Sequence, residues 1–201
     1  IITITDNMKT ELKIIDFLVG NLDKKVTINE LSKNINGYYS FVHKTITNLT
    51  NYGVINKIKA GKAYLCSLNL ENDKTLILLQ ELEYERINEF FGKNKELKII
   101  ISDFIQAKIP HIITAVLFGS YVKGKATKKS DIDIFILTKQ KTDLSKLTKE
   151  MHAKYGKEIN SIVMNLNEFK KQKDTILIKE IIENHLVLHN IVDFVRLFFK
   201  K

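Results

Sequence analysis

Two apolar segments, separated by a glycine- and lysine-rich loop, constrain the fold of this 201-residue chain more than any other feature. The first reads HIITAVLF and the second reads DIDIFIL. Short runs rich in Val, Ile and Phe predict strands whose two faces are both buried. Gly119-Ser120 follow the first segment directly, and Asp131 and Asp133 open the second. We therefore expect these polar residues at the ends of two buried strands.

Asp131 and Asp133 are two positions apart, so on a strand both carboxylates point to one face while Ile132 points to the other. Two carboxylates this close repel each other, and beside an apolar strand they need a cation to be tolerated. Ligands that are all oxygen favour Mg²⁺ or Mn²⁺, which commonly bridge to substrate phosphates. We predict that Asp131 and Asp133 bind this metal and are catalytic.

The loop between the two segments carries the expected phosphate contacts. Gly119 lets a phosphate approach the backbone closely, and Ser120 offers a hydroxyl and an N–H group. Lys129 and Ser130 complete the predicted nucleotide-binding set, in a loop that contains four lysines. Phosphate on one side and metal on the other is the arrangement that phosphoryl or nucleotidyl transfer needs.

A P-loop is the rival interpretation, because Gly119 to Lys125 reads G-x-x-x-x-G-K. Residue 126 is Ala, however, where a P-loop has the Ser or Thr that binds its metal. A P-loop also continues into a full helix, and only residues 126–130 separate Lys125 from the next predicted strand. The spacing therefore excludes a P-loop.

The first seventy residues have another pattern. Helical periodicity at 8–20, 28–35 and 41–53 predicts three helices, the last with Ser40 as its N-cap. Two alternating segments then flank an Ala-Gly-Lys turn and predict a β-hairpin. Helix, helix, helix and hairpin is the order of a winged helix-turn-helix, which we assign to residues 1–70.

The rest of the chain divides into two further segments. Residues 71–107 are expected to be a helical linker with a break near Gly92, although these helices could also belong to the core of the following domain. Residues 108–201 alternate between strands and helices, which predicts a small mixed-sheet domain with C-terminal helices. The expected fold class is therefore α+β.

Composition restricts the partners. The chain has 32 Lys and Arg against 23 Asp and Glu, for a formal net charge of +9, which favours nucleic acid or nucleotides as partners. No apolar run approaches the roughly 18 residues of a membrane span, and the N-terminus shows no secretory pattern. The single cysteine, Cys66, suits a reducing compartment. We expect a cytoplasmic protein without a membrane partner.

An apolar residue, Gly-Ser, a basic loop and Asp-x-Asp together resemble the DNA polymerase β-like nucleotidyltransferases, most closely the minimal ones. The resemblance extends over residues 95–190, and its matching positions are Phe118, Gly119, Ser120, Gly124, Ala126, Ser130, Asp131 and Asp133. It implies that Gly119-Ser120 contact an NTP triphosphate and that the aspartates hold a divalent metal. Such enzymes join a nucleoside monophosphate to a protein or nucleic-acid hydroxyl and release pyrophosphate, and some are antitoxins.

The family usually has a third carboxylate on a later strand, where it helps to activate the attacking hydroxyl. The expected strand is KEINSIVM, and Asn160 occupies the position where the family has Asp. Glu158 lies on the same face two residues earlier, and we assign it as the catalytic substitute. Nucleotide sensing without turnover and an antitoxin role stay open as alternatives.

The N-terminal pattern resembles winged-helix transcription regulators. This resemblance implies binding to double-stranded DNA, with the third helix in the major groove and the hairpin on the backbone. The predicted DNA-binding residues are Ser40, His43, Lys44 and Asn48 on the helix, joined by Tyr39 and Thr47, with Lys57, Lys59 and Lys62 on the hairpin. Use of the winged helix for protein contacts or for a homodimer is the alternative.

Overall fold

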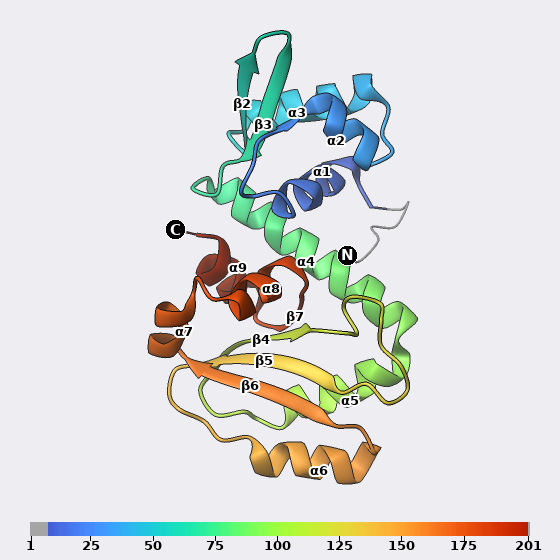
Figure 1. Cartoon of the computed structure of the whole chain (residues 1–201), viewed down its shortest axis with the longest axis vertical. Helices are drawn as coiled ribbons and strands as arrows, with labels where there is room; N and C mark the ends of the chain where they lie inside the picture. Colours follow the sequence, from blue (N-terminus) through green and yellow to red (C-terminus); the bar gives the residue numbers. More distant parts are fainter. Residues whose placement is uncertain (1–7, 201) are drawn as a thin grey trace. The chain divides into compact units, whose positions relative to one another are not determined.

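A computed structural model describes residues 8–200 of the chain, which form two compact units (Figure 1). The N-terminal unit contains residues 8–85 and 195–200, and the C-terminal unit contains residues 86–194. The division falls inside α4 (Asp73–Lys93). No helix among these described residues is long and apolar enough to cross a membrane.

The N-terminal unit is the expected winged helix-turn-helix. Its helices are α1 (Thr10–Val19), α2 (Ile28–Asn34) and α3 (Tyr39–Asn51), and its strands are β1 (Val26–Thr27), β2 (Ile55–Ala60) and β3 (Ala63–Leu68). The strands form an antiparallel sheet in the order β1-β3-β2. In α3, the residues at helical spacing, Val42, Ile46 and Leu49, are fully buried. The helices and the hairpin therefore share one apolar core.

A side chain caps α2, but the cap expected for α3 is not formed. The Thr27 hydroxyl accepts a hydrogen bond from the backbone N–H of Glu30 at 3.1 Å, so it caps α2. Ser40 does not cap α3, because the helix already begins at Tyr39 and Ser40 lies in its first turn. Tyr38 takes the N-cap position without a side-chain hydrogen bond.

The C-terminal unit is built on a mixed four-stranded sheet. Its elements are α5 (Lys95–Gln106), β4 (Ile112–Phe118), β5 (Ile132–Thr138), α6 (Ser145–Tyr155), β6 (Ile159–Asn165), α7 (Leu166–Gln172), α8 (Ile176–Glu183) and β7 (Leu186–His189), followed by α9 (Ile191–Phe199). The strand order is β6-β5-β4-β7. Strands β5 and β6 are parallel, and the other pairs are antiparallel.

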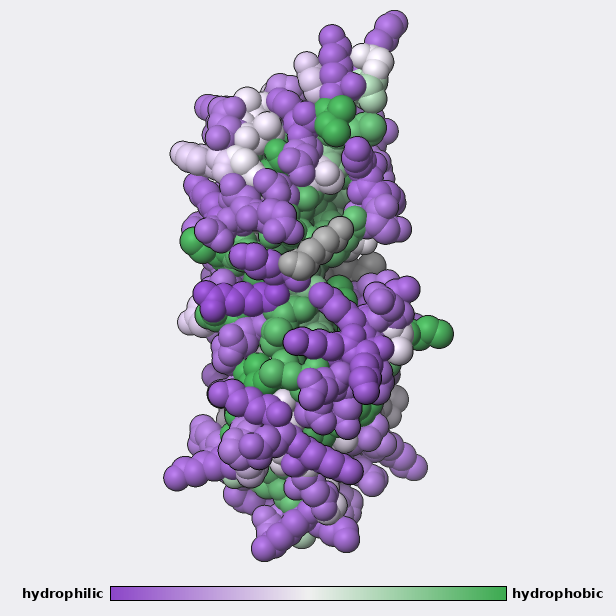
Figure 2. Space-filling view, turned by 90° about the vertical axis from the view of Figure 1, so that its left-hand side faces the viewer, coloured by the Kyte–Doolittle hydropathy of each residue, from purple (hydrophilic) through white to green (hydrophobic). Residues whose placement is uncertain are grey.

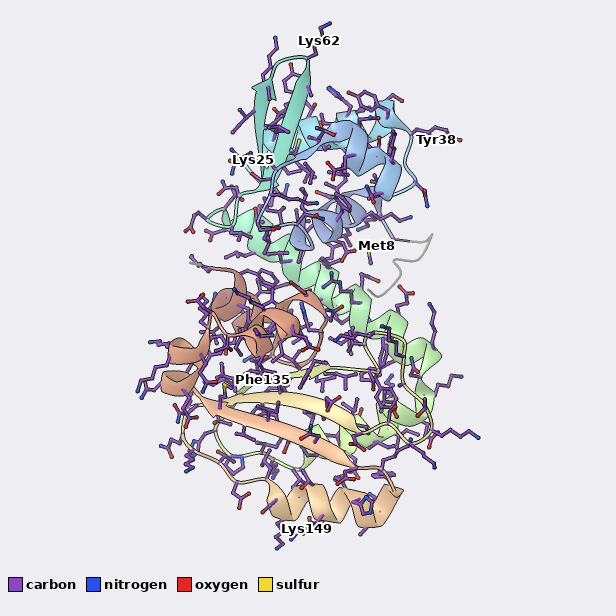
Figure 3. All side chains as sticks on the ribbon, in the orientation of Figure 1. Met8, Lys25, Tyr38, Lys62, Phe135 and Lys149 are labelled. Carbon is purple, nitrogen blue, oxygen red and sulfur yellow. The ribbon has the colours of Figure 1, made fainter. Side chains whose placement is uncertain are left out.

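The alternation along β5 gives the sheet two different faces. Ile132, Ile134 and Ile136 are fully buried in a core that also contains residues of α5 and α6. Phe135 points the other way and packs against Phe169 of α7, with 6.4 Å between ring centroids (Figure 3). Asp133 shares the face of Phe135, because it lies two residues earlier on the same strand.

Two features of this unit differ from the sequence analysis. Strand β7 was not predicted, because a four-residue apolar run does not distinguish a strand from the end of a helix. The helical segment at 71–107 is divided at Asn94, close to the expected break near Gly92, but it differs in its place in the fold. Its second half is no separate linker, since Phe90, Ile100 and Phe104 lie in the core of the C-terminal unit.

The lone cysteine lies on β3 in the N-terminal unit, where Cys66 pairs with Val26 on one side and Lys57 on the other. Its side chain is fully buried, and burial raises the pKa of the Cys66 thiol to about 11. The thiol is therefore protonated at neutral pH. The reactive form of a cysteine is the thiolate, so the folded chain presents an inert sulfur.

We therefore expect Ellman's reagent to react slowly with the native protein at pH 8. After unfolding in guanidinium the thiol is exposed and its pKa returns towards about 8.5, so the reaction should become fast. Thiol titration against time, with the unfolded chain as its own control, measures the difference. Rapid stoichiometric labelling of the folded chain would show that Cys66 is accessible.

Candidate functional site

The end of β4 brings Gly119 against an aspartate of β5. Phe118 is the register partner of Asp133 in the antiparallel β4–β5 pair, and Gly119 follows it with φ of +76°. A Cβ atom at Gly119 would lie 3.0 Å from Cγ of Asp133 and would overlap its Oδ2 atom. Glycine is therefore required here for two reasons: the backbone is left-handed, and the Asp133 carboxylate occupies the space that a side chain would need.

The chain after Gly119 forms a tight helical turn. The N–H of Lys123 donates to the Gly119 carbonyl at 3.1 Å, and the N–H of Lys125 donates to the Ser120 carbonyl at 3.0 Å. Ser120 is half-buried in the first turn. The two predicted phosphate-contacting residues therefore lie together in this turn, with Gly119 directly beside Asp133.

The remainder of the loop is held by its own hydrogen bonds. The Ser130 hydroxyl accepts from the N–H of Thr127 at 2.8 Å, so this side chain is already engaged within the loop. Lys129 is exposed. Lys123 is paired with Glu180 of α8 at 2.5 Å, which offsets part of the positive charge of the loop. The nucleotide-binding roles of Lys129 and Ser130 stay predictions.

A lysine that the sequence analysis did not identify links this loop to the sheet through hydrogen bonds. The Lys157 ammonium group donates to the carbonyl of Lys128 at 2.6 Å and to the Tyr121 hydroxyl at 3.4 Å. Lys157 precedes β6 in the chain, and no local pattern marks it. Only the parallel pairing of β5 with β6 brings it to the loop.

The parallel β5–β6 pair aligns the predicted acidic residues with a polar neighbour. Asp133 is the register partner of Asn160, whose side-chain amide donates to Asp133 Oδ1 at 3.1 Å. One step earlier, the N–H of Ile132 donates to the carbonyl of Glu158 at 2.9 Å. Asp131, Asp133, Glu158 and Asn160 therefore all lie at the same end of these two strands.

The carboxylates are less buried than the apolar run suggested. Asp131 and Glu158 are exposed, and Asp133 is half-buried, because they lie at the open end of the sheet. Within residues 8–200, no three His, Cys, Asp or Glu side chains lie close enough together to hold a metal. The pair Asp131 and Asp133 nevertheless fits Mg²⁺, which is usually bound by one or two carboxylates and completed by substrate phosphates and water.

A cavity of about 460 Å³ opens beside this end of the sheet. The strand side contributes Asp131, Glu158 and Asn160, and the start of α6 with the residues before it contributes Asp143, Ser145 and Thr148. The cavity thus extends from the acidic positions along the outer side of β6.

Comparison with known proteins decides the family. The sequence model of the nucleotidyltransferase domain matches residues 97–189. Two curated proteins of Methanocaldococcus jannaschii, each named as a proposed protein adenylyltransferase, are also similar. One is 36% identical over 75 residues, which is 37% of this chain and 75% of the relative. The other is 33% identical over 97 residues, which is 45% of this chain and 89% of the relative. The chain belongs to the nucleotidyltransferase family.

Among solved structures, a toxin–antitoxin crystal structure with AMP-PNP is similar, with a TM-score of 0.41 and 22% identity over 49% of this chain and 77% of that chain. The matched segment of the nucleotidyltransferase domain contains the Gly119 turn, both aspartates and the start of β6. The resemblance drawn from the motif is therefore confirmed at the level of the family.

The predicted DNA-binding residues all lie in the N-terminal unit, on α3 and the hairpin. Ser40, Lys44 and Asn48 are exposed at positions i, i+4 and i+8, so they form one stripe along α3. His43 is half-buried, and its ring lies 6.0 Å from that of Tyr39. The helix thus presents a polar face opposite its buried side.

The hairpin lysines are not equivalent. Lys62 lies at the tip of the hairpin and Lys59 is exposed on β2 (Figure 3). Lys57 is half-buried, with its Nζ atom 5.1 Å from the centroid of the Tyr64 ring and 3.5 Å from the Thr47 hydroxyl. The ammonium groups of Lys59 and Lys62 are therefore more accessible to a ligand than that of Lys57.

We expect Gly119→Ala to impair the nucleotidyltransferase site more than it impairs the fold. The new methyl group would displace the Asp133 carboxylate, and displaced groups around a metal lower its affinity by roughly tenfold or more. Gly124→Ala is the matched control, because Gly124 also has positive φ, at +66°, but open space around its Cβ position.

Both variants should lose about 1–2 kcal/mol of stability to the left-handed backbone. Calorimetry with Mg²⁺ and each of the four NTPs, together with denaturant unfolding, separates the two effects. Equal nucleotide affinity in the two variants would show that the Gly119–Asp133 contact is irrelevant to binding.

Proposed function

We propose that the C-terminal unit binds an NTP together with Mg²⁺ or Mn²⁺ and transfers its nucleoside monophosphate to a hydroxyl group. The observation that carries this proposal is the placement of Gly119, which Ser120 follows, directly against Asp133 of the Asp-x-Asp pair. The two relatives are each named as a proposed protein adenylyltransferase, and these names favour ATP as the donor and a protein as the acceptor.

In the proposed reaction the acceptor oxygen attacks the α-phosphorus and forms a new O–P bond. The bond from the α-phosphorus to the oxygen that bridges to the β-phosphate breaks, and pyrophosphate leaves. The acceptor proton passes to Glu158, the exposed carboxylate at the end of β6. A metal ion held by Asp131 and Asp133 supplies neutralisation of the phosphate charge when it is bound.

The other residues of the chain bind and orient. Ser120 and Lys129 contact the triphosphate in this proposal, and the open backbone at Gly119 leaves room for both phosphate and carboxylate. Asn160 fixes Asp133 by donating to its Oδ1 atom, which leaves the Oδ2 atom for a ligand. A carboxylate that is oriented before substrate arrives loses less freedom on binding.

One observation favours a second candidate, a nucleotide-sensing regulator without turnover. The residue that faces Asp133 from β6 is an amide, and an amide cannot accept the proton of an attacking hydroxyl. Nucleotide binding needs only the elements at the ends of β4 and β5. Turnover needs Glu158 in addition.

We expect the double variant Asp131→Asn and Asp133→Asn to abolish Mg²⁺-dependent NTP binding, because the metal loses both of its anionic ligands. Calorimetry with each NTP measures this loss. Asp23→Asn with Asp174→Asn is the charge-matched control, since both of these aspartates are exposed and distant in sequence from the site. Unchanged affinity in the first double variant would refute the site.

Transfer of labelled nucleotide to proteins of a cell extract separates the two candidates. If the chain is an enzyme, Glu158→Gln should bind NTP normally but transfer little label, because only the base is removed. If it is a sensor, the wild type should bind NTP and transfer nothing. Asn160→Asp, which restores the carboxylate usual in the family, should then create transfer activity.

We also propose that the N-terminal unit binds double-stranded DNA, and that this module couples the nucleotidyltransferase domain to its site of action. The support is the exposed stripe of α3 together with the free lysines Lys59 and Lys62 on the hairpin. Figure 2 shows hydrophilic side chains over most of the visible surface. The N-terminal unit has a small excess of basic residues, 12 Lys and Arg against 9 Asp and Glu in residues 8–85 and 195–200. Tyr38 and Phe41 are 88% and 56% exposed, which favours a protein contact as the alternative.

Lys44→Ala with Lys59→Ala should weaken DNA binding and lower the slope of log K against log salt by about two, one for each lost phosphate contact. Lys146→Ala with Lys149→Ala removes the same charge from α6 and serves as the control. Fluorescence anisotropy with a labelled duplex at several salt concentrations measures both. If the wild-type chain has no affinity for DNA at low salt, the proposal is refuted.

A further inference from the structure

Strand β6 is one of the two edge strands of the C-terminal sheet, and β7 is the other (Figure 1). It runs for seven residues and pairs on one side only, with β5. In the described part of the chain, no other segment forms backbone hydrogen bonds with its outer side. An unpaired strand edge is a template for a further strand, and natural proteins usually protect it.

The hydrogen bond from Ile132 to the Glu158 carbonyl identifies the groups that face outward. Backbone groups alternate along a strand, so Glu158 and Asn160 direct theirs toward β5. Ile159, Ser161 and Val163 therefore present their N–H and C=O groups to the free side. These same three residues line the cavity of about 460 Å³.

The cavity links the free edge to the proposed site of transfer. Its far wall is formed by the start of α6, with Leu144 and Thr148, and its near end reaches Asp131 and Glu158. Its volume lies within the range of about 300–1,000 Å³ that is usual for ligand sites. A segment lying along β6 would therefore pass directly by the two carboxylates.

The charge of the lining differs from that of the chain. Every charged residue that lines the cavity in the described part of the chain is acidic: Asp131, Asp143 and Glu158. The chain as a whole has a net charge of +9. Hydrogen bonds from Ser145, and more weakly the charge of the exposed Lys149 of α6, lower the pKa of Asp143 and keep this carboxylate ionised. The lining is thus complementary to a basic segment.

We propose that the free edge of β6, with this cavity, is the docking site of the protein acceptor. A basic, extended acceptor segment adds to β6 as a further strand and carries a Ser, Thr or Tyr hydroxyl to the end where Asp131 and Glu158 lie. Main-chain hydrogen bonds supply the affinity in such strand addition, and pockets for alternate side chains supply the selectivity. This inference rests on the proposed transfer to a hydroxyl.

The probe is a labelled peptide, Lys-Val-Lys-Tyr-Lys-Val-Lys, and the control is the same peptide with Glu in place of each Lys. The expected result is binding of the Lys peptide by the full chain in fluorescence anisotropy, with much weaker binding of the Glu peptide. Ser161→Pro should lower the affinity for the Lys peptide by about tenfold or more, because proline removes an outward N–H and blocks strand pairing. Ser161→Ala keeps that N–H, and its binding should persist.

Circular dichroism and NTP calorimetry report whether each variant is folded. If Ser161→Pro is not folded, Val163→Pro removes the next outward N–H on the same edge and replaces it in the test. Equal binding of the Lys and Glu peptides, no binding of either, or full binding by a folded proline variant would overturn the inference. Absence of NTP binding in the wild type would instead refute the proposed function, which distinguishes the two failures.

Discussion

The backbone ladder that joins β4, β5 and β6 determines the whole arrangement of the site. Its register places Phe118 opposite Asp133 and Asp133 opposite Asn160. The end of β4 therefore lies beside the starts of β5 and β6. Because side chains alternate along a strand, a shift of one residue would turn Asp133 into the core and Ile132 out of it. The buried residues Ile132, Ile134 and Ile136 prevent that shift, since their apolar surface would be exposed to water. The core thus holds the carboxylates in place.

Asn160 gives this member of the family its particular character. The amide satisfies one oxygen of Asp133 without adding negative charge, so it relieves the repulsion that a third carboxylate would add. The same substitution removes a proton acceptor from the row. In the proposed function, binding and turnover of nucleotide therefore depend on different residues: Asp131 and Asp133 for the first, and Glu158 for the second.

Charged side chains are unevenly distributed over the surface. The exposed lysines Lys44, Lys59 and Lys62 lie on α3 and the hairpin, whereas the charged residues that line the β6 cavity are acidic. Most of the excess of basic residues nevertheless lies in the C-terminal unit, where residues 86–194 contain 19 Lys and Arg and 13 Asp and Glu. In the loop before β5 the positive charge is also partly used within the protein, since Lys123 pairs with Glu180 and Lys157 holds the carbonyl of Lys128.

Local patterns were sufficient for much of the fold. The winged helix-turn-helix, the mixed sheet and the strands on both sides of the Gly119 loop were predicted correctly, because their periodicity and turn residues are properties of short segments. Patterns failed where partners decide structure. Strand β7 is too short to be distinguished from a helix end, and it is a strand because β4 offers it a pairing edge. The pattern of residues 71–107 left open whether they form a linker or belong to the following core, because an amphipathic helix does not reveal which core buries it.

In the site, too, some features follow from local patterns and others depend on strand pairing. Local spacing is enough to predict the residue types at one end of the sheet: a glycine turn, two carboxylates on one face, and an amide in place of a third carboxylate. The pairing of distant strands adds three facts that spacing does not contain: Gly119 must lack a side chain to make room for Asp133, Asn160 bonds to that aspartate, and β6 has a free edge beside acidic residues. The reason is physical: spacing along a strand sets the direction of a side chain, whereas its neighbours depend on pairing between distant segments.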